Sequence, residues 1–146
     1  MRQEAQLFIA KHMSATLFTK QLQNLDRSFD TLGGDAFQRT LDAAVNLLVL
    51  ALTDNGPVLV CGNGGFAADS QHIAGELVGK FLKERRPLNV RSLAVDASVM
   101  TAWANDVAYD TVFSRQVEAY SQAGGVLLTI STSGNSQNVI LAAKKA

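Results

Sequence analysis

Hydrophobic and polar positions divide the chain into an N-terminal part with a helical pattern and a second part in which short apolar runs alternate with helical patterns. From about residue 3 to 31, leucine and phenylalanine recur at roughly helical spacing with charged residues between them, which predicts a helix. Gly33-Gly34 ends that pattern, and a second helix is predicted over about 36–53.

The helix over 36–53 is apolar on nearly all sides, as expected of a helix that is buried all round. A chain of 146 residues has little core in which to bury it. We therefore expect this helix to lie between subunits; the alternative is that the α/β core of its own chain covers it.

Beyond residue 56, apolar runs bounded by turn residues are typical of buried strands. Strands are predicted over 58–61, 89–95 and 126–130, and helices from the glycine-rich turn to about 84, from 96 or 98 to about 105, over 109–120 and from about 137. Strands that alternate with helices predict parallel βαβ units with right-handed crossovers, and so an α/β fold.

These elements predict a single domain over 1–146, with an N-terminal helical hairpin over 1–53 and an α/β core over 57–146. Three parallel strands are few for a stable open sheet, whose usual number is about four to six. We therefore expect that a C-terminal part of the core is missing from this sequence.

Composition narrows the functional classes. Thirteen basic and thirteen acidic side chains balance, so the sequence does not build the basic surface of a nucleic-acid-binding protein. A single cysteine excludes an internal disulfide and suits a reducing cytosol. The first residues lack the apolar segment of a signal peptide, and the longest apolar run, 43–52, is too short to span a membrane. We expect a cytoplasmic protein that binds neither nucleic acid nor membrane.

A glycine-rich turn follows the first predicted strand. Gly62, Gly64 and Gly65 permit a sharp turn and a close approach of a ligand to the backbone. The helix that follows directs free N–H groups and the positive end of its dipole at this turn, which favours an anion such as a phosphate ester.

A second polar loop, 131–136, places four hydroxyl side chains between the third strand and a helix. Hydroxyls and backbone N–H groups at a helix start bind phosphate without lysine; the alternative is an ordinary capping loop. Because ligands bind beyond the carboxyl ends of parallel strands, two such loops at two strand ends favour phosphate binding.

His72 and Glu76 lie four residues apart, on one face of the helix that follows the first loop. They can form an ordinary surface pair. Near an anion-binding loop, Glu76 can also act as a base that moves a proton between adjacent sugar carbons. Together they offer two ligands to Zn²⁺, which needs at least one more.

Taken together, these motifs closely resemble the phosphoheptose isomerases, which are sugar isomerase (SIS) domain enzymes. The matching segments are Cys61–Gly65, Gln71–Ala74 with Glu76, Asn105-Asp106, Phe113–Glu118 and Ile130–Ser136. The resemblance implies a flavodoxin-like parallel sheet flanked by helices, in a homotetramer whose N-terminal helices form a central bundle. It also implies isomerisation of sedoheptulose 7-phosphate to D-glycero-D-manno-heptose 7-phosphate through an enediol, for nucleotide-activated heptose and bacterial lipopolysaccharide.

The resemblance also implies roles for single residues. Glu76 matches the family's catalytic base. Glu76 and His72 also match two of the residues that bind one Zn²⁺ per subunit. The positions that match substrate-binding residues are Asn63, Gly64, Gly65, Glu76, Asn105, Asp106, Ser131, Thr132, Ser133 and Ser136. The implied substrate is a phosphorylated seven-carbon sugar.

The sequence departs from the family pattern in two places. Phe66 stands where the family usually has Ser, and it cannot donate a hydrogen bond to a sugar. The family's further Gln and its catalytic, zinc-binding His belong to a C-terminal helix that this sequence does not include. The alternative is a non-catalytic SIS-domain protein that binds a phosphosugar and associates with the replication initiator. Glu76 favours the enzyme, and Phe66 leans toward the alternative.

Overall fold

The computed structural model describes residues 15–146, which fall into two compact units, one up to Val45 and one over Asn46–Ala146. The first contains α2 (Ala15–Leu32) and the start of α3 (Asp35–Thr53), joined by a turn at Gly33-Gly34. The predicted helix therefore ends where expected, and its predicted start, residues 3–14, lies outside the described residues. Antiparallel packing of the two helices as a hairpin stays a prediction.

An exposed apolar stripe runs along α2. Its members are Phe18, Leu22, Leu25, Phe29 and Leu32. Their side chains are 39–66% exposed, and they recur at alternating spacings of four and three residues. This is the heptad spacing of helices that pack along one another.

The C-terminal end of α3 belongs to the second unit. Ala51 is buried there, with Leu48 and Leu52 packed against the same cluster, whereas Leu47 and Leu50 are 60% and 63% exposed. The α/β core thus covers only one face of this end of α3. That the rest of α3 lies between subunits stays a prediction.

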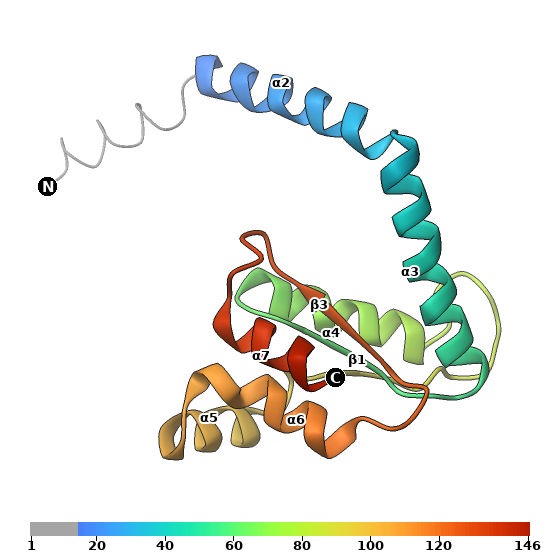
Figure 1. Ribbon diagram of the computed structural model, residues 1–146, viewed down its shortest axis with the longest axis vertical. Coiled ribbons are helices and arrows are strands. Elements are labelled where there is room, and N and C mark those ends of the chain that lie inside the picture. The colour runs from blue at the N-terminus through green and yellow to red at the C-terminus, as the bar shows by residue number, and fades with distance from the viewer. Residues whose placement is uncertain (1–14) are drawn as a thin grey trace, which may run out of the picture. The chain divides into compact units, whose positions relative to one another are not determined.

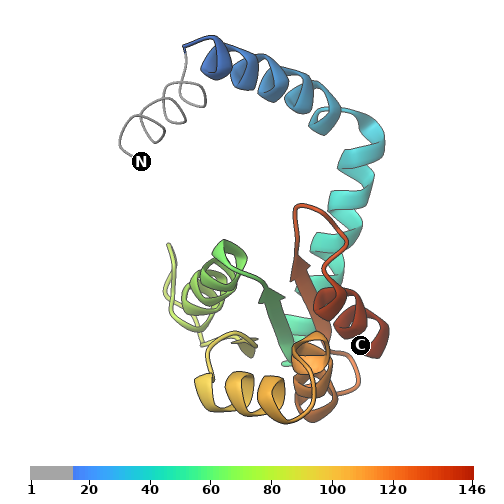
Figure 2. The same ribbon diagram turned by 90° about the vertical axis from the view of Figure 1, so that its left-hand side faces the viewer.

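The second unit is built on a parallel sheet of three strands in the order β2-β1-β3. The strands are β1 (Val58–Gly62), β2 (Val90–Ser92) and β3 (Val126–Ile130). Val58 of the central strand pairs with Val90 on one side and Val126 on the other. Figure 2 shows that β1 and β3 end at the same edge of the sheet. The predicted α/β class is confirmed.

Helices cover both faces of the sheet (Figure 1). Because side chains alternate along a strand, Leu59 and Cys61 of β1 join the cluster made with α6 (Val112–Tyr120) and α7 (Gln137–Lys145). Val58 and Val60 join the cluster made with α4 (Gly65–Val78) and the end of α3. The central strand is therefore buried on both sides, as its continuous apolar run predicts.

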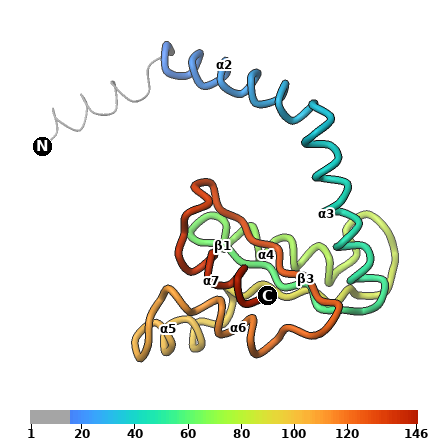
Figure 3. The backbone as a smooth tube through the Cα atoms, in the orientation of Figure 1, coloured from blue at the N-terminus to red at the C-terminus, as the bar shows by residue number. Residues whose placement is uncertain are grey.

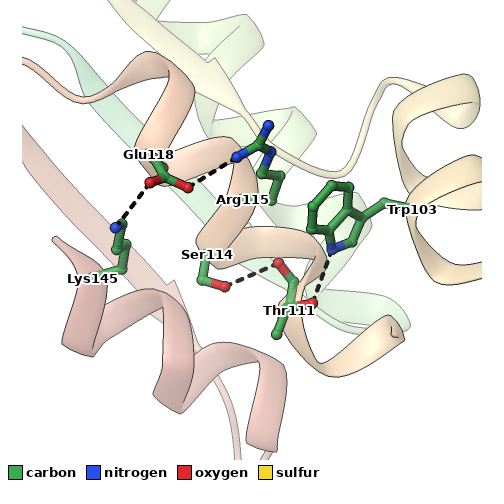
Figure 4. A network of polar contacts seen from close by, with 6 residues as sticks. All are labelled: Trp103, Thr111, Ser114, Arg115, Glu118 and Lys145. Carbon is green, nitrogen blue, oxygen red and sulfur yellow. Dashed lines mark hydrogen bonds and ion pairs between the residues drawn. The ribbon is translucent and has the colours of Figure 1, made fainter. Parts of the chain in front are cut away.

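The helices on the α6 face are tied together by a network of polar contacts (Figure 4). Trp103 of α5 (Ala97–Asp106) donates to Thr111 in the short helix η1 (Tyr109–Thr111). Glu118 of α6 accepts from Arg115 on its own helix and from Lys145 of α7. As expected, Asp96 caps α5, because its Oδ1 accepts from the Val99 N–H at 3.0 Å.

Two predicted boundaries were wrong. The helix α4 ends at Val78 rather than near residue 84, because the Arg85 guanidinium donates to the backbone carbonyls of Glu76 and Leu77. Strand β2 covers only Val90–Ser92 of the predicted 89–95, because the Ser92 hydroxyl accepts from the Ala94 N–H and turns the chain. Within residues 15–146, none of the helices is long and apolar enough to cross a membrane.

Candidate functional site

The glycine-rich turn and the serine loop lie side by side at the carboxyl ends of two neighbouring strands. Gly62, the last residue of β1, pairs with Ile130, the last residue of β3, so Asn63 and Ser131 follow at the same edge of the sheet. Figure 3 traces the backbone through both turns, from β1 into α4 and from β3 into α7.

Close packing explains the glycine at the end of β1. A Cβ atom on Gly62 would lie 2.5 Å from Cβ of Phe66 and 2.9 Å from the Ile130 carbonyl oxygen. Gly64 has φ +57°, which suits glycine, and the Phe66 N–H donates to the Asn63 carbonyl to close the turn. Phe66 is half-buried at the start of α4.

The serine loop is held by its own side chains. The Ser131 hydroxyl accepts from the Gly134 N–H and lies 3.4 Å from the Ser136 hydroxyl, while Ser133 accepts from the Asn135 N–H. Ser136 precedes the first residue of α7, and Thr132 and Ser133 are exposed. The loop therefore presents hydroxyls next to the N-terminus of α7.

The side-chain amide of Asn138, which the sequence did not single out, joins the first loop to the start of α7. Asn63 and Asn138 exchange hydrogen bonds through their side chains, Nδ2 to Oδ1 in both directions at 2.8 Å. The Tyr109 hydroxyl also donates to Asn63 Oδ1, at 2.9 Å. Asn138 is only 3% exposed, and its place directly before the apolar run 139–143 is the one local signal that could have pointed to it.

Asn105 and Asp106 lie at the C-terminal end of α5, shortly before Tyr109. Both are exposed, and Asn105 Nδ2 donates to Asp106 Oδ1 at 2.8 Å. Among the hydrogen bonds of the described residues, none joins this pair to either loop. The structure therefore brings Asn63 and the serine loop together, and leaves Asn105 and Asp106 on a neighbouring turn.

His72 and Glu76 form a pair on α4, with His72 Nε2 3.3 Å from Glu76 Oε1. Glu76 lies eleven residues beyond Gly65, which is about 16 Å along a helix. Both line a groove of about 630 Å³, whose other walls come from the end of α4 and from residues 80–85. The described residues contain no group of three or more His, Cys, Asp or Glu side chains able to hold a metal ion.

Cys61 lies in the strand that leads into the first loop, but burial raises the pKa of its thiol to about 11. The thiolate is the nucleophilic form of cysteine. Cys61 therefore serves the packing of the sheet rather than the chemistry of the loop.

Known proteins match this chain closely. The family model described as the SIS domain matches residues 34–146. A phosphoheptose isomerase of Aquifex aeolicus is 53% identical over 109 residues, which are 75% of this chain and 56% of that protein. One of Helicobacter pylori is 49% identical over 112 residues, with 77% and 58% covered. The chain thus spans a little over half the length of these curated relatives.

Solved structures agree with the sequence comparison. The structure of a phosphoheptose isomerase from Neisseria gonorrhoeae matches with a TM-score of 0.73 and 40% identity, over 97% of this chain and 68% of that one. One from Francisella tularensis matches with a TM-score of 0.67 and 30% identity, over 86% and 69%. The chain belongs to the SIS domain family and, within it, to the phosphoheptose isomerase family.

Proposed function

We propose that the protein is a phosphosugar isomerase that converts sedoheptulose 7-phosphate into D-glycero-D-manno-heptose 7-phosphate. The observation that carries the proposal is the juxtaposition of the two loops at the ends of β1 and β3, in a chain about 50% identical to proteins named phosphoheptose isomerase. The same names do not favour the alternative of a non-catalytic protein that associates with the replication initiator.

The phosphate group binds at the serine loop in this proposal. Hydroxyls of Ser131, Thr132, Ser133 and Ser136 and the N–H groups at the start of α7 supply donors for a phosphate, and the helix dipole adds favourable charge. The neighbouring loop contacts the sugar through Asn63, Gly64 and Gly65. The adjoining turn also binds the sugar, through Asn105 and Asp106.

Glu76 is the proposed base. Its carboxylate removes a proton from C1 of the ketose, the electron pair forms the C1–C2 double bond of an enediol, and the carbonyl oxygen at C2 gains a proton. The proton on Glu76 then returns to C2 as the C1 hydroxyl loses its proton to give the aldehyde. Glu76 lies on α4, three turns beyond the first loop and next to His72.

We also propose one Zn²⁺ per subunit, held in part by His72 and Glu76. Two ligands about 2.1 Å from a tetrahedral zinc ion lie roughly 3.4 Å apart, and the 3.3 Å between His72 Nε2 and Glu76 Oε1 fits that geometry. Because the described residues of one chain supply no third ligand of this kind beside them, the remaining ligands would come from elsewhere in the assembly. When bound, zinc would act as a Lewis acid toward the sugar's oxygen atoms.

We also propose an assembly and a location for the protein, and a use for its product. We infer a cytoplasmic homotetramer in which the stripe on α2 packs against other copies, and a product that is used for nucleotide-activated heptose and lipopolysaccharide. The exposed heptad spacing of Phe18, Leu22 and Leu25 supports the assembly.

Turnover of sedoheptulose 7-phosphate by the full-length protein tests the function. Glu76→Gln keeps the size of the side chain but removes the base, so we expect kcat to fall by at least about a hundredfold. The matched control is Glu84→Gln, an exposed carboxylate beyond the end of α4, which should keep the original rate. A Glu76→Gln variant with unchanged kcat would show that the base is another residue.

A further inference from the structure

We propose that Tyr109 and Asn138 are positioning residues that orient the carboxamide of Asn63 toward the bound phosphosugar, an inference that rests on the proposed function. Three segments meet in this one group of side chains. Asn63 comes from the first loop, Tyr109 from η1, and Asn138 from the first turn of α7, directly after the serine loop.

The backbone fixes which way both amides face. The N–H of Val139 donates to Asn138 Oδ1 at 3.0 Å, and an N–H group can only donate. The Nδ2 atom of Asn138 must therefore face Asn63, where it donates to Oδ1. That in turn fixes the orientation of Asn63, so the Tyr109 hydroxyl acts as the donor in its contact with the same oxygen.

This arrangement decides what Asn63 offers a ligand. Its Oδ1 accepts two hydrogen bonds, from Asn138 and from Tyr109, which use both lone pairs. Its Nδ2 donates one N–H to Asn138, and the described residues supply no acceptor for the other. Asn63 is half-buried at the edge of the sheet. It therefore meets the sugar as a donor only, suited to a phosphoryl or hydroxyl oxygen.

Asn138 is far more buried than Tyr109. A substitution at Tyr109 can therefore test the positioning role with less effect on the stability of the fold. Asn138 is 3% exposed, so its truncation leaves a buried gap and unpaired polar groups. Tyr109 is 48% exposed, and loss of its hydroxyl alone leaves the ring in place. Tyr109→Phe is therefore the informative variant, and Asn138→Ala serves only where it folds.

The experiment measures the affinity of the full-length protein for sedoheptulose 7-phosphate by titration calorimetry, together with KM, kcat and the melting temperature. We expect Tyr109→Phe to weaken binding and raise KM about three- to tenfold, the usual effect of one lost hydrogen bond. The melting temperature should stay within about 1 °C, and kcat within about twofold. The control is Tyr120→Phe, the same chemical change in a ring that packs under Arg91.

A double-mutant cycle with Asn63→Ala completes the test. If Tyr109 acts through Asn63, Tyr109→Phe should have no further effect on affinity in the Asn63→Ala background. An equal effect in both backgrounds, or no effect in either, overturns the proposal. Protein that binds the sugar phosphate without turnover would contradict the proposed reaction, while the affinity cycle would still test the positioning role.

Discussion

Single residues at the end of β1 determine how closely the two loops approach. Gly62 packs against Phe66 and the Ile130 carbonyl at distances that exclude a Cβ atom. The sequence predicted a turn here from its glycines, and it predicted hydroxyls in the second loop. It did not predict the Asn63–Asn138 pair, because those residues are 75 positions apart and no local pattern links them.

Gly62→Ala should therefore destabilise the protein. A methyl group at 2.9 Å from the Ile130 carbonyl forces β3 or the start of α4 to shift, and we expect a loss of about 2 kcal/mol, typical of overpacking. Urea unfolding measures the change. Gly75→Ala is the control, because its Cβ meets open space in the interior of α4 and should stabilise the helix by up to about 1 kcal/mol. Equal effects of the two substitutions would contradict this account.

A second prediction concerns the reactivity of the Cys61 thiol. Since burial raises the pKa of its thiol to about 11, almost no thiolate exists at neutral pH. Alkylation by iodoacetamide should be at least about a hundredfold slower in the folded protein than in urea, as followed by mass spectrometry. Rapid modification of the folded protein would mean that β1 opens readily.

At the scale of elements, the existence and type of the described helices and strands could be predicted, but two of their ends could not. Apolar periodicity finds the face of α6 that carries Val112, Phe113 and Val117, all of which are buried. The end of α4 depends instead on Arg85, which reaches back to two carbonyls from beyond the helix. Such a contact between separate segments leaves no periodic signal.

The contact between α6 and α7 should weaken in acid. A hydrogen bond from Lys145, followed in importance by its charge and by the hydrogen bond from Arg115, lowers the pKa of Glu118 below its usual 4.5. A lowered pKa in the folded state means that the stabilisation is present above pH 4.5 and is lost as the pH falls through the folded-state pKa.

When the pH falls from about 6 to about 3.5, the melting temperature of the Glu118→Gln variant should therefore fall less than that of the original protein. The difference should be small, because the carboxylate is exposed, and it should shrink further in about 1 M salt. Calorimetry at several pH values measures it. A parallel fall of both proteins would show that this ion pair does not contribute to acid sensitivity.

In the whole protein, the exposed apolar stripe of α2 is the feature that a single chain does not explain. Because Leu22 and Leu25 are 48% and 53% exposed, burying them between copies would supply roughly 1.5 kcal/mol or more for each side chain. The double substitution Leu22→Glu with Leu25→Glu should therefore reduce the assembly to smaller species, as measured by light scattering after gel filtration.

The control for the stripe is Gln23→Glu with Asn24→Glu, which adds the same charge to α2 away from the stripe. This variant should keep the mass of the original assembly. If both double variants have the original mass, the stripe of α2 does not hold the copies together.

The long separation of Asn63 from Asn138 has a consequence for protein synthesis. A ribosome adds about 5–20 residues per second, so the 75 positions between the two amides take roughly 4 to 15 seconds to translate. During that interval β1 has been made without β3, so one edge of the central strand has no partner strand. Chaperones that cover such edges should bind this polypeptide most strongly before β3 is free to pair with β1.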